Sequence, residues 1–412
     1  MRELGRLRRH AAVGIVVILG IASAGCSAAV SSPTPQPTAP ATQSSSAPTS
    51  AAPTRSGGWT ELHWSAPSLI PGDAALLDVA AWHDGYVAVG DLGTPDGHLG
   101  VALTSADGVT WQRSPDSTFT AILLRVVATA TRLIAVGNRP GPTPSSDAWT
   151  SLDGRTWQHQ DDLVLAGAGI TALAARGETI VAVTVDASGG TTMWRSVDGG
   201  GWSSGQPPPG RAIVRNVVAV SDGFLAVGRD GEPDTGAGVG VRGVGRPAAW
   251  WSGDGVAWTA VPVEGTPAAG AQLIEVFRVA AGFFAVGSDS TTPGQGERSA
   301  LLWDSVDARS WHLVGPPSHW GMAGANGQHA VVFAYDGPAA NPAGWVSKDG
   351  RQWTQLAFTG DVTDVPVVQP FVGMTGHIDR MFVLPRGVLV VGQLTVQQAG
   401  HIAAWFADAA PR

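Results

Sequence analysis

Cysteine and lysine are almost absent from this chain of 412 residues: Cys26 is its one cysteine and Lys348 its one lysine. A single cysteine excludes an internal disulfide, so noncovalent contacts must hold the fold together. Only 14% of the residues are charged, and the formal net charge is −8. An acidic chain that is poor in lysine argues against nucleic-acid binding, because phosphates are bound by clusters of basic side chains.

The apolar run near the N-terminus, residues 11–22, is short for a membrane span. Arginines precede it, and small residues lead from it to Cys26, an order typical of a secretion signal. The segment Ser23–Cys26 resembles the bacterial lipobox, whose cysteine becomes lipidated, although Ser23 stands where that motif prefers leucine. The resemblance implies that residues 1–25 are a lipoprotein signal peptide and that Cys26 is the lipidation site. An ordinary secreted protein with an incidental cysteine is the alternative.

Residues 26–57 form the next segment, and its composition is dominated by Ser, Thr, Pro and Ala. Such a segment has too few apolar side chains to build a core, and its prolines favour extended backbone. We therefore expect a tether that holds the remaining chain, residues 58–412, away from the outer face of the cytoplasmic membrane.

A seven-residue phrase that ends in tryptophan recurs six times after the tether. The copies are SADGVTW (Ser105–Trp111), SLDGRTW (Ser151–Trp157), SVDGGGW (Ser196–Trp202), SGDGVAW (Ser252–Trp258), SVDARSW (Ser305–Trp311) and SKDGRQW (Ser347–Trp353). Successive tryptophans are 46, 45, 56, 53 and 42 residues apart. A repeat of this length cannot bury its own apolar face, so the copies must stack on one another.

Each repeat contains further short apolar segments that predict β-strands. One segment ends in Ala-Val-Gly, as in Tyr86–Gly90 and Phe224–Gly228, and seven such segments occur when looser copies are included. Another apolar strand precedes each, and the Asp-Gly of the phrase indicates a tight hairpin. Four strands per repeat and seven repeats predict an all-β fold, a seven-bladed β-propeller of four-stranded blades.

The last repeat, residues 378–412, has only three of these strands. The missing strand is present at the other end of the folded part, because Gly58–Leu62 resembles Ala257–Val261. We expect this N-terminal strand to complete the last blade, close the ring and remove its open edges.

The repeated phrase resembles the Asp-box of sialidases and related propellers, Ser-x-Asp-x-Gly-x-x-Trp, although it is one residue shorter here. Together with Cys26, this makes the chain resemble secreted bacterial lipoproteins of the actinobacterial type that carry a sialidase-like propeller. The resemblance implies that the box is a structural turn remote from any active site. The six aspartates are therefore interpreted as fold residues: Asp107, Asp153, Asp198, Asp254, Asp307 and Asp349.

The longest connections between strands, such as residues 229–247, 288–298 and 354–377, are expected at one face, where the innermost strands begin. Long loops on a rigid scaffold commonly carry binding residues. Aligned innermost strands also place polar residues in one register that could ring the mouth of the central channel, unless they are ordinary polar strand ends. The candidate ligand-binding residues are Asp78, Arg125, Asn216, Glu275 and Arg380.

Four aspartates, Asp186, Asp230, Asp289 and Asp336, share a register just beyond the second strand of their repeats. Carboxylates in that place are weak candidates for a hard cation. Aspartate is also a common first residue of a loop, and no closely spaced histidine pair supports a metal site. No metal and no cofactor are expected.

Three functions remain open. The first is a noncatalytic binding or scaffold module at the cell envelope, a monomer that recognises a protein or glycan through the long-loop face. The second is a glycan-active enzyme, glycosidase or lyase, as the resemblance to sialidases implies. Against a sialidase, the chain has only two tyrosines, Tyr86 and Tyr335, and no Phe-Arg-Ile-Pro segment. The third is an assembly factor for an envelope complex, because lipid-anchored propellers that assist photosystem II assembly carry similar phrases.

Overall fold

The structure of the protein is a computed structural model. It describes residues 59–94, 97–115, 119–140, 145–160, 165–166, 168–232, 245–265, 271–288, 300–314, 320–335, 342–360, 376–396 and 399–409. The expected signal peptide, Cys26 and the tether lie outside the described residues. Within the described part, no helix is long and apolar enough to be a membrane span; the helical content there is one 3₁₀ turn, Pro71–Asp73.

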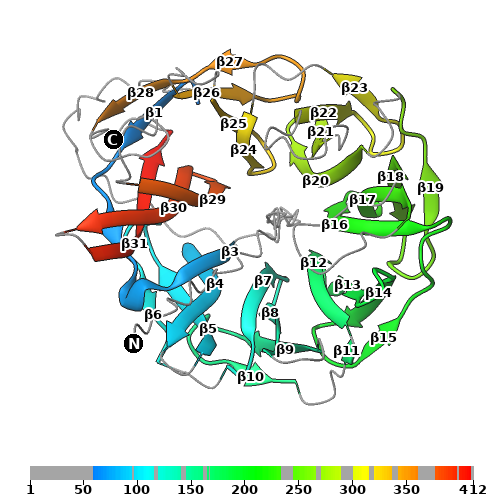
Figure 1. The fold of residues 1–412 in the computed structure, drawn as a ribbon, viewed down its shortest axis with the longest axis horizontal. Helices are drawn as coiled ribbons and strands as arrows, with labels where there is room; N and C mark the ends of the chain where they lie inside the picture. The colour runs from blue at the N-terminus through cyan, green and yellow to red at the C-terminus, as the bar shows by residue number, and fades with distance from the viewer. Residues whose placement is uncertain are drawn as a thin grey trace, which may run out of the picture.

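Seven β-sheets stand around a central axis as the blades of a propeller (Figure 1), which confirms the predicted fold. Blade 1 consists of β3 (Ala75–Trp82), β4 (Gly85–Thr94), β5 (Gly97–Ser105) and β6 (Gln112–Arg113). Blade 2 consists of β7 (Ile122–Ala128), β8 (Leu133–Asn138), β9 (Ser145–Ser151) and β10 (Gln158–His159), with β11 (Leu165–Ala166) added to β9. Blade 3 consists of β12 (Ala168–Arg176), β13 (Thr179–Asp186), β14 (Thr191–Val197) and β15 (Trp202–Ser204).

The remaining blades follow the same order. Blade 4 consists of β16 (Ala212–Val220), β17 (Gly223–Gly231), β18 (Gly245–Ser252) and β19 (Thr259–Val261). Blade 5 consists of β20 (Gln272–Val279), β21 (Gly282–Ser288), β22 (Ala300–Ser305) and β23 (His312–Val314). Blade 6 consists of β24 (Trp320–Ala325), β25 (Ala330–Tyr335), β26 (Pro342–Ser347) and β27 (Thr354–Gln355). Blade 7 consists of β29 (Gly376–Leu384), β30 (Gly387–Val396), β31 (Ala399–Asp408) and the N-terminal β1 (Glu61–Trp64).

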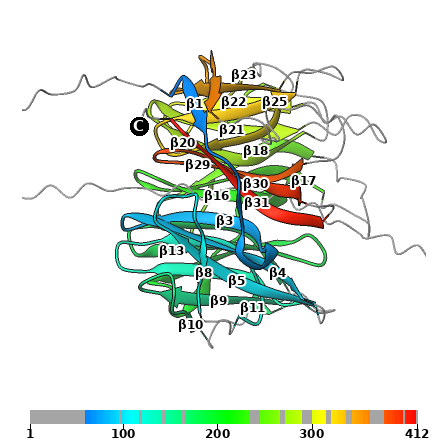
Figure 2. The same ribbon diagram turned by 90° about the vertical axis from the view of Figure 1, so that its left-hand side faces the viewer.

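Strand β1 closes the ring, as predicted. It pairs antiparallel with β31, His63 opposite Asp408, and parallel with β28 (Ala357–Gly360) on its other side. Figures 1 and 2 show β1, from the start of the folded chain, beside strands from its end. The strand begins three residues after the start of the Gly58–Leu62 segment that suggested it and extends to Trp64, because alternation buries Leu62 and Trp64.

The second strand of each blade is buried on both faces, which explains its apolar Ala-Val-Gly sequence. In β4, Val87, Ala88 and Val89 are at most 2% exposed. The glycine of the Ala-Val-Gly segment is required because the innermost strand approaches it closely. A Cβ at Gly90 would lie 1.8 Å from the carbonyl oxygen of Ala75, so no side chain fits there.

The six boxes form turns between the third and fourth strands. In the first box, Oδ1 of Asp107 accepts hydrogen bonds from the backbone amides of Val109 (2.9 Å) and Thr110 (2.7 Å). The Ser105 hydroxyl donates to Asp107 and accepts from the amide of Gly108 (2.8 Å). The boxes of blades 2, 4, 5 and 6 repeat this pattern. The aspartates therefore cap turns, as expected.

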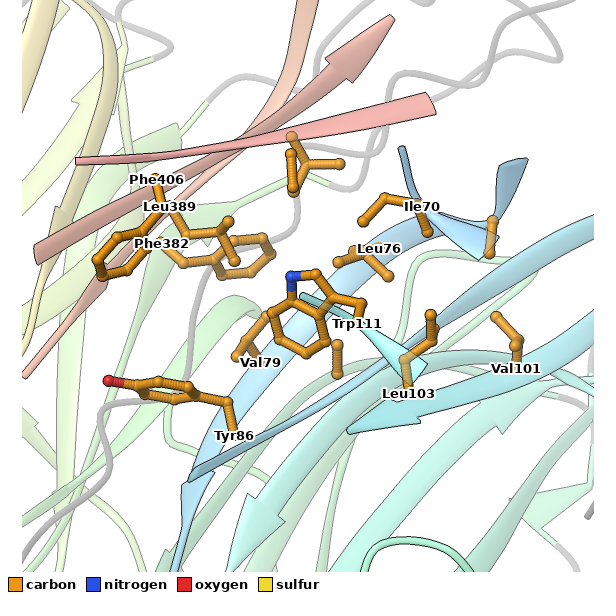
Figure 3. Packing of buried hydrophobic residues seen from close by; sticks show 14 of the residues in the cluster. Ile70, Leu76, Val79, Tyr86, Val101, Leu103, Trp111, Phe382, Leu389 and Phe406 are labelled. Carbon is orange, nitrogen blue, oxygen red and sulfur yellow. The ribbon is translucent and has the colours of Figure 1, made fainter. Parts of the chain in front are cut away.

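The box tryptophan packs into the seam between its own blade and the preceding one. Figure 3 shows Trp111 of blade 1 among Leu76, Val79 and, from blade 7, Phe382 and Phe406. Each seam holds a comparable apolar cluster. The repeats therefore stack as expected, and they bury their apolar faces between adjacent blades. Each apolar side chain removed from water there contributes about 1.5–3 kcal/mol to stability.

Candidate functional site

All seven innermost strands carry a β-bulge at the same level of the ring. The extra residue lies immediately before the position that the sequence alignment selected, as at Leu77 before Asp78 and Leu124 before Arg125. The same shift occurs in the other five blades. The aligned register is therefore confirmed, and its physical basis is a repeated bulge.

The polar side chains at this level reach into the seam toward the next blade. Asp78 is fully buried; its Oδ1 accepts a hydrogen bond from the amide of Val79 and its Oδ2 one from the amide of Val126 in blade 2, both at 2.9 Å. Asn216 repeats the relation between blades 4 and 5, where its Oδ1 accepts from the amide of Val276 at 3.4 Å. Val126 and Val276 each follow the aligned residue of their strands, so these bonds connect one bulge to the next.

Arg125 is the basic counterpart in this ring. Its side chain is 2% exposed and donates to the carbonyl of Leu124 (2.9 Å) and to that of Thr171 in blade 3 (2.8 Å), the extra residues of two bulges. Burial lowers the pKa of Arg125 to about 10, while the charges of Asp78 and Glu275 oppose that shift. The guanidinium therefore stays protonated at neutral pH and acts as a fixed cation.

Glu275 and Arg380 belong to the same electrostatic group. Glu275 is 7% exposed, and its charge raises the pKa of Arg125, whereas the charge of Arg380 lowers it. Acidic and basic side chains from blades 1, 2, 5 and 7 thus influence one another around the axis. The structure places the candidate residues at the inner ends of seams, where Asp78, Arg125 and Asn216 form hydrogen bonds with protein backbone. A ligand-binding role for the five residues stays a prediction.

The extra residues of the bulges differ in exposure from the residues beside them in four of the blades. Both faces of each innermost strand pack against neighbouring blades and one edge is paired, so the remaining open side is the edge toward the axis (Figure 1). Leu77, Leu124, Thr171 and Arg215 are part-exposed within otherwise buried stretches, whereas the corresponding Ile274 of blade 5 is buried. The sequence alignment did not single out these residues, because a bulge interrupts the two-residue alternation of a strand.

Two of the four candidate cation ligands lie in the described residues, and they belong to different blades. Oδ1 of Asp186 accepts from the amides of Ser188 (2.8 Å) and Gly190 (2.9 Å) in its own turn. Oδ1 of Asp230 accepts from the amide of Arg211 (2.8 Å). Asp289 and Asp336 lie outside the described residues. Among the residues that the structure does describe, no group of three His, Cys, Asp or Glu side chains is arranged to hold a metal ion.

The opposite face, where the box turns lie, contains a hollow of about 420 Å³ between blades 1 and 2. It is lined by the first hairpin of blade 1, around Trp82 and Asp84, by Thr104 of β5, and by Asp153 and Arg155 of the second box. The sequence analysis did not identify this hollow. Its lining comes from segments up to about 70 residues apart in the sequence, which only the seam brings together.

No protein-family model and no curated protein matches the sequence. Among solved structures, YCF48 bound to a D1 peptide is similar, with a TM-score of 0.50 and 17% identity over 83% of this chain and 94% of that chain. The β-propeller domain of the Trilobed protease from Pyrococcus furiosus gives a TM-score of 0.43 and 9% identity, over 71% and 86% of the two chains. A Trypanosoma rangeli sialidase in complex with sialic acid gives 0.39 and 10%, over 77% of this chain and 56% of the sialidase. At such identities the likeness concerns the fold: the chain is a seven-bladed β-propeller.

Proposed function

We propose that the protein is a noncatalytic binding module that captures a protein partner at the face where the innermost strands begin. The observation that carries this proposal is that the charged side chains around the axis are already engaged in contacts between blades. Asp78 and Arg125, the side chains that a reaction at the channel would need, bond the backbone of neighbouring bulges and are almost fully buried. Such contacts make the ring rigid, and a rigid scaffold presents its loops with little loss of conformational entropy on binding.

The fold comparison agrees with this function. YCF48, which has the same architecture, was solved with a bound D1 peptide. A protein or peptide partner for this chain, and a role in assembling an envelope complex, are consistent with that observation. The propeller would then act by holding a partner in place.

The proposal includes a lipid anchor at Cys26, which would keep the propeller at the outer face of the cytoplasmic membrane. Replacement of Cys26 by serine removes the thiol that the lipid modifies. We expect Cys26→Ser to release the chain from membranes or to stop its processing, measured by fractionation and by the mass of the mature N-terminus. A correctly processed variant that stays in the membrane fraction would refute the anchor and leave the binding proposal intact.

Site-specific photo-crosslinking tests the binding face. Arg246 is the second residue of β18, at the proposed face, and its side chain is 81% exposed. Lys348 is exposed in the box turn of blade 6, at the opposite face. With benzoyl-phenylalanine at one position or the other in the full chain, we expect discrete protein adducts from position 246 and none from position 348. Adducts from position 348 alone, or from neither, would contradict the choice of face.

The glycan-active alternative is tested beside this experiment. Tyr86 is 7% exposed, and burial raises its pKa, as expected for a core residue rather than a nucleophile; the side chain of Tyr335 lies outside the described residues. We expect no turnover of fluorogenic sialosides or glycosides by the purified chain. Turnover that is lost in Arg125→Lys with unchanged unfolding temperature would favour the enzyme.

A further inference from the structure

The hollow between blades 1 and 2 has both charge and an aromatic wall. Trp82 and Asp84 come from the hairpin of blade 1, and Arg155 from the second box. Among the described residues, neither the Asp84 carboxylate nor the Arg155 guanidinium has a side-chain hydrogen bond or ion pair, although both line the same space. The question is what this space would accept.

The seam between blades 4 and 5 can be compared with the seam between blades 1 and 2, because in it the corresponding space is filled by side chains of the protein. Arg309, from the fifth box, lies with its guanidinium carbon 3.7 Å from the centre of the Trp251 ring. The same guanidinium forms an ion pair with Asp222 of the blade 4 hairpin. A cation held between an indole face and a carboxylate is therefore a native feature of this propeller.

The side chain of Thr104 explains why the seam between blades 1 and 2 is open. In blade 4, Trp251 pairs with Leu225, and in blade 1 the same position is Thr104, which pairs with Val87. Threonine leaves empty the volume that an indole occupies in blade 4. In the seam between blades 1 and 2, the aromatic side chain that lines the hollow is instead Trp82, from the innermost strand.

The charged positions correspond in the same way. Asp84 and Asp222 each precede the glycine that begins the second strand, and Arg155 and Arg309 each follow their box aspartate by two residues. In the seam between blades 4 and 5, Arg309 forms an ion pair with Asp222. In the seam between blades 1 and 2 the two side chains border the hollow without an ion pair between them. Both halves of the pair are thus present at the hollow, but Asp84 does not form the ion pair with Arg155 that Asp222 forms with Arg309.

We propose that the hollow between blades 1 and 2 binds an arginine side chain of a partner protein. Asp84 takes the guanidinium, as Asp222 does in blade 4, and the Trp82 indole provides the face beside it. The carboxylates of Asp107 and Asp153 also line the hollow, so three carboxylates there outnumber the single guanidinium of Arg155. This excess of negative charge, together with the net charge of −8, favours a basic ligand. The site lies at the face opposite the proposed partner surface, so it stands independently of that proposal.

An exposed apolar residue next in sequence to a lining residue favours a protein segment over a free small cation. Leu152 immediately precedes Asp153 in the second box, and its side chain is 68% exposed. An apolar neighbour of the incoming arginine would cover it. An arginine flanked by leucine in a partner chain therefore matches both the charge of the hollow and the apolar Leu152 beside Asp153.

The test uses the purified full chain labelled with 5-fluorotryptophan and the peptide acetyl-Leu-Arg-Leu-amide. The fluorine signal of Trp82 is assigned by its loss in Trp82→Phe. We expect a saturable shift of that signal on titration with the peptide. The isosteric peptide in which citrulline replaces arginine should cause no such shift, because citrulline has the shape of arginine but no charge.

Matched variants separate this site from general attraction to an acidic surface. We expect Asp84→Asn to weaken binding by about tenfold or more, and Asp222→Asn, the equivalent change in the filled seam, to leave it unchanged. Thr104→Trp should fill the hollow, as Trp251 fills its counterpart, and should abolish the shift while the unfolding temperature is retained. If Thr104→Trp fails to fold, the Asp84 and Asp222 pair still decides the matter.

Three results would overturn the proposal. The first is the absence of a saturable shift up to the solubility of the peptide. The second is equal binding of the citrulline peptide. The third is equal weakening by Asp84→Asn and Asp222→Asn, which would mean that the peptide responds to net charge and not to the hollow.

Discussion

Ring closure depends on a short strand, and Trp64 is the residue through which that dependence can be measured. Its side chain is 1% exposed and lies 6.3 Å, centre to centre, from both Phe333 and Phe358. Truncation to alanine removes these contacts and leaves a cavity, which costs about 3–5 kcal/mol for a buried tryptophan. An unfolding entropy of about 2 cal/mol/K per residue over roughly 350 residues converts this into a decrease of about 4–7 °C in Tm.

Differential scanning calorimetry of Trp64→Ala beside Leu152→Ala provides the measurement. Leu152 is 68% exposed, so its truncation should change stability by no more than about 0.5 kcal/mol, which is below about 1 °C. Removal of residues 27–50, from the expected tether, should likewise have almost no effect. A Tm for Trp64→Ala equal to that of Leu152→Ala would refute the role of β1 in closing blade 7.

Three further predictions concern the ring and the boxes. Asp78→Asn removes one of two acceptors for buried amides, including that of Val126, and should lower the free energy of unfolding by about 2–3 kcal/mol in urea denaturation; a loss below that of a surface variant would exclude the inter-blade contact. Gly255→Ala places a Cβ 2.5 Å from Val181 at a φ of 78°, and should cost about 2 kcal/mol or more by the same assay. Hydrogen bonds from the box amides lower the pKa of Asp254 below 3.8, so its contribution to stability is present above that pH and is lost as the pH falls through the folded-state pKa. The stability difference between the native chain and Asp254→Ala should therefore shrink between pH 5 and pH 2, and a difference that stays constant would contradict this assignment.

The box turns could be predicted from sequence because their contacts are local. The hydrogen bonds among Ser105, Asp107 and Gly108 lie within one seven-residue box. The same turn is therefore expected wherever this sequence occurs. Blade 3 shows the limit of this rule. In its box, SVDGGGW, Asp198 itself has a φ of 62° and the Ser196 hydroxyl donates to the carbonyl of Gly200, because three successive glycines admit a different turn.

The seven blades and their closure also followed from the sequence. The count of Ala-Val-Gly segments and the missing last strand are properties of the repeat, and a closed ring is the arrangement that leaves no blade edge unpaired. The bounds of β1 were less accurate because they depend on which side chains find a buried face, and Leu62 and Trp64 do so against blades 6 and 7.

The direction of the ring residues was decided by tertiary structure alone. Alignment selected the register of Asp78 and Arg125, but only the folded ring shows that these side chains lie in the seams, where they bond to Val126 and Thr171 of the next blade. The hollow is a stronger case. Thr104 opens it only because Trp82, Asp84 and Arg155 meet there. Sequence repeats specify contacts within a blade, whereas a site between blades depends on residues of different repeats whose proximity exists only in the folded ring.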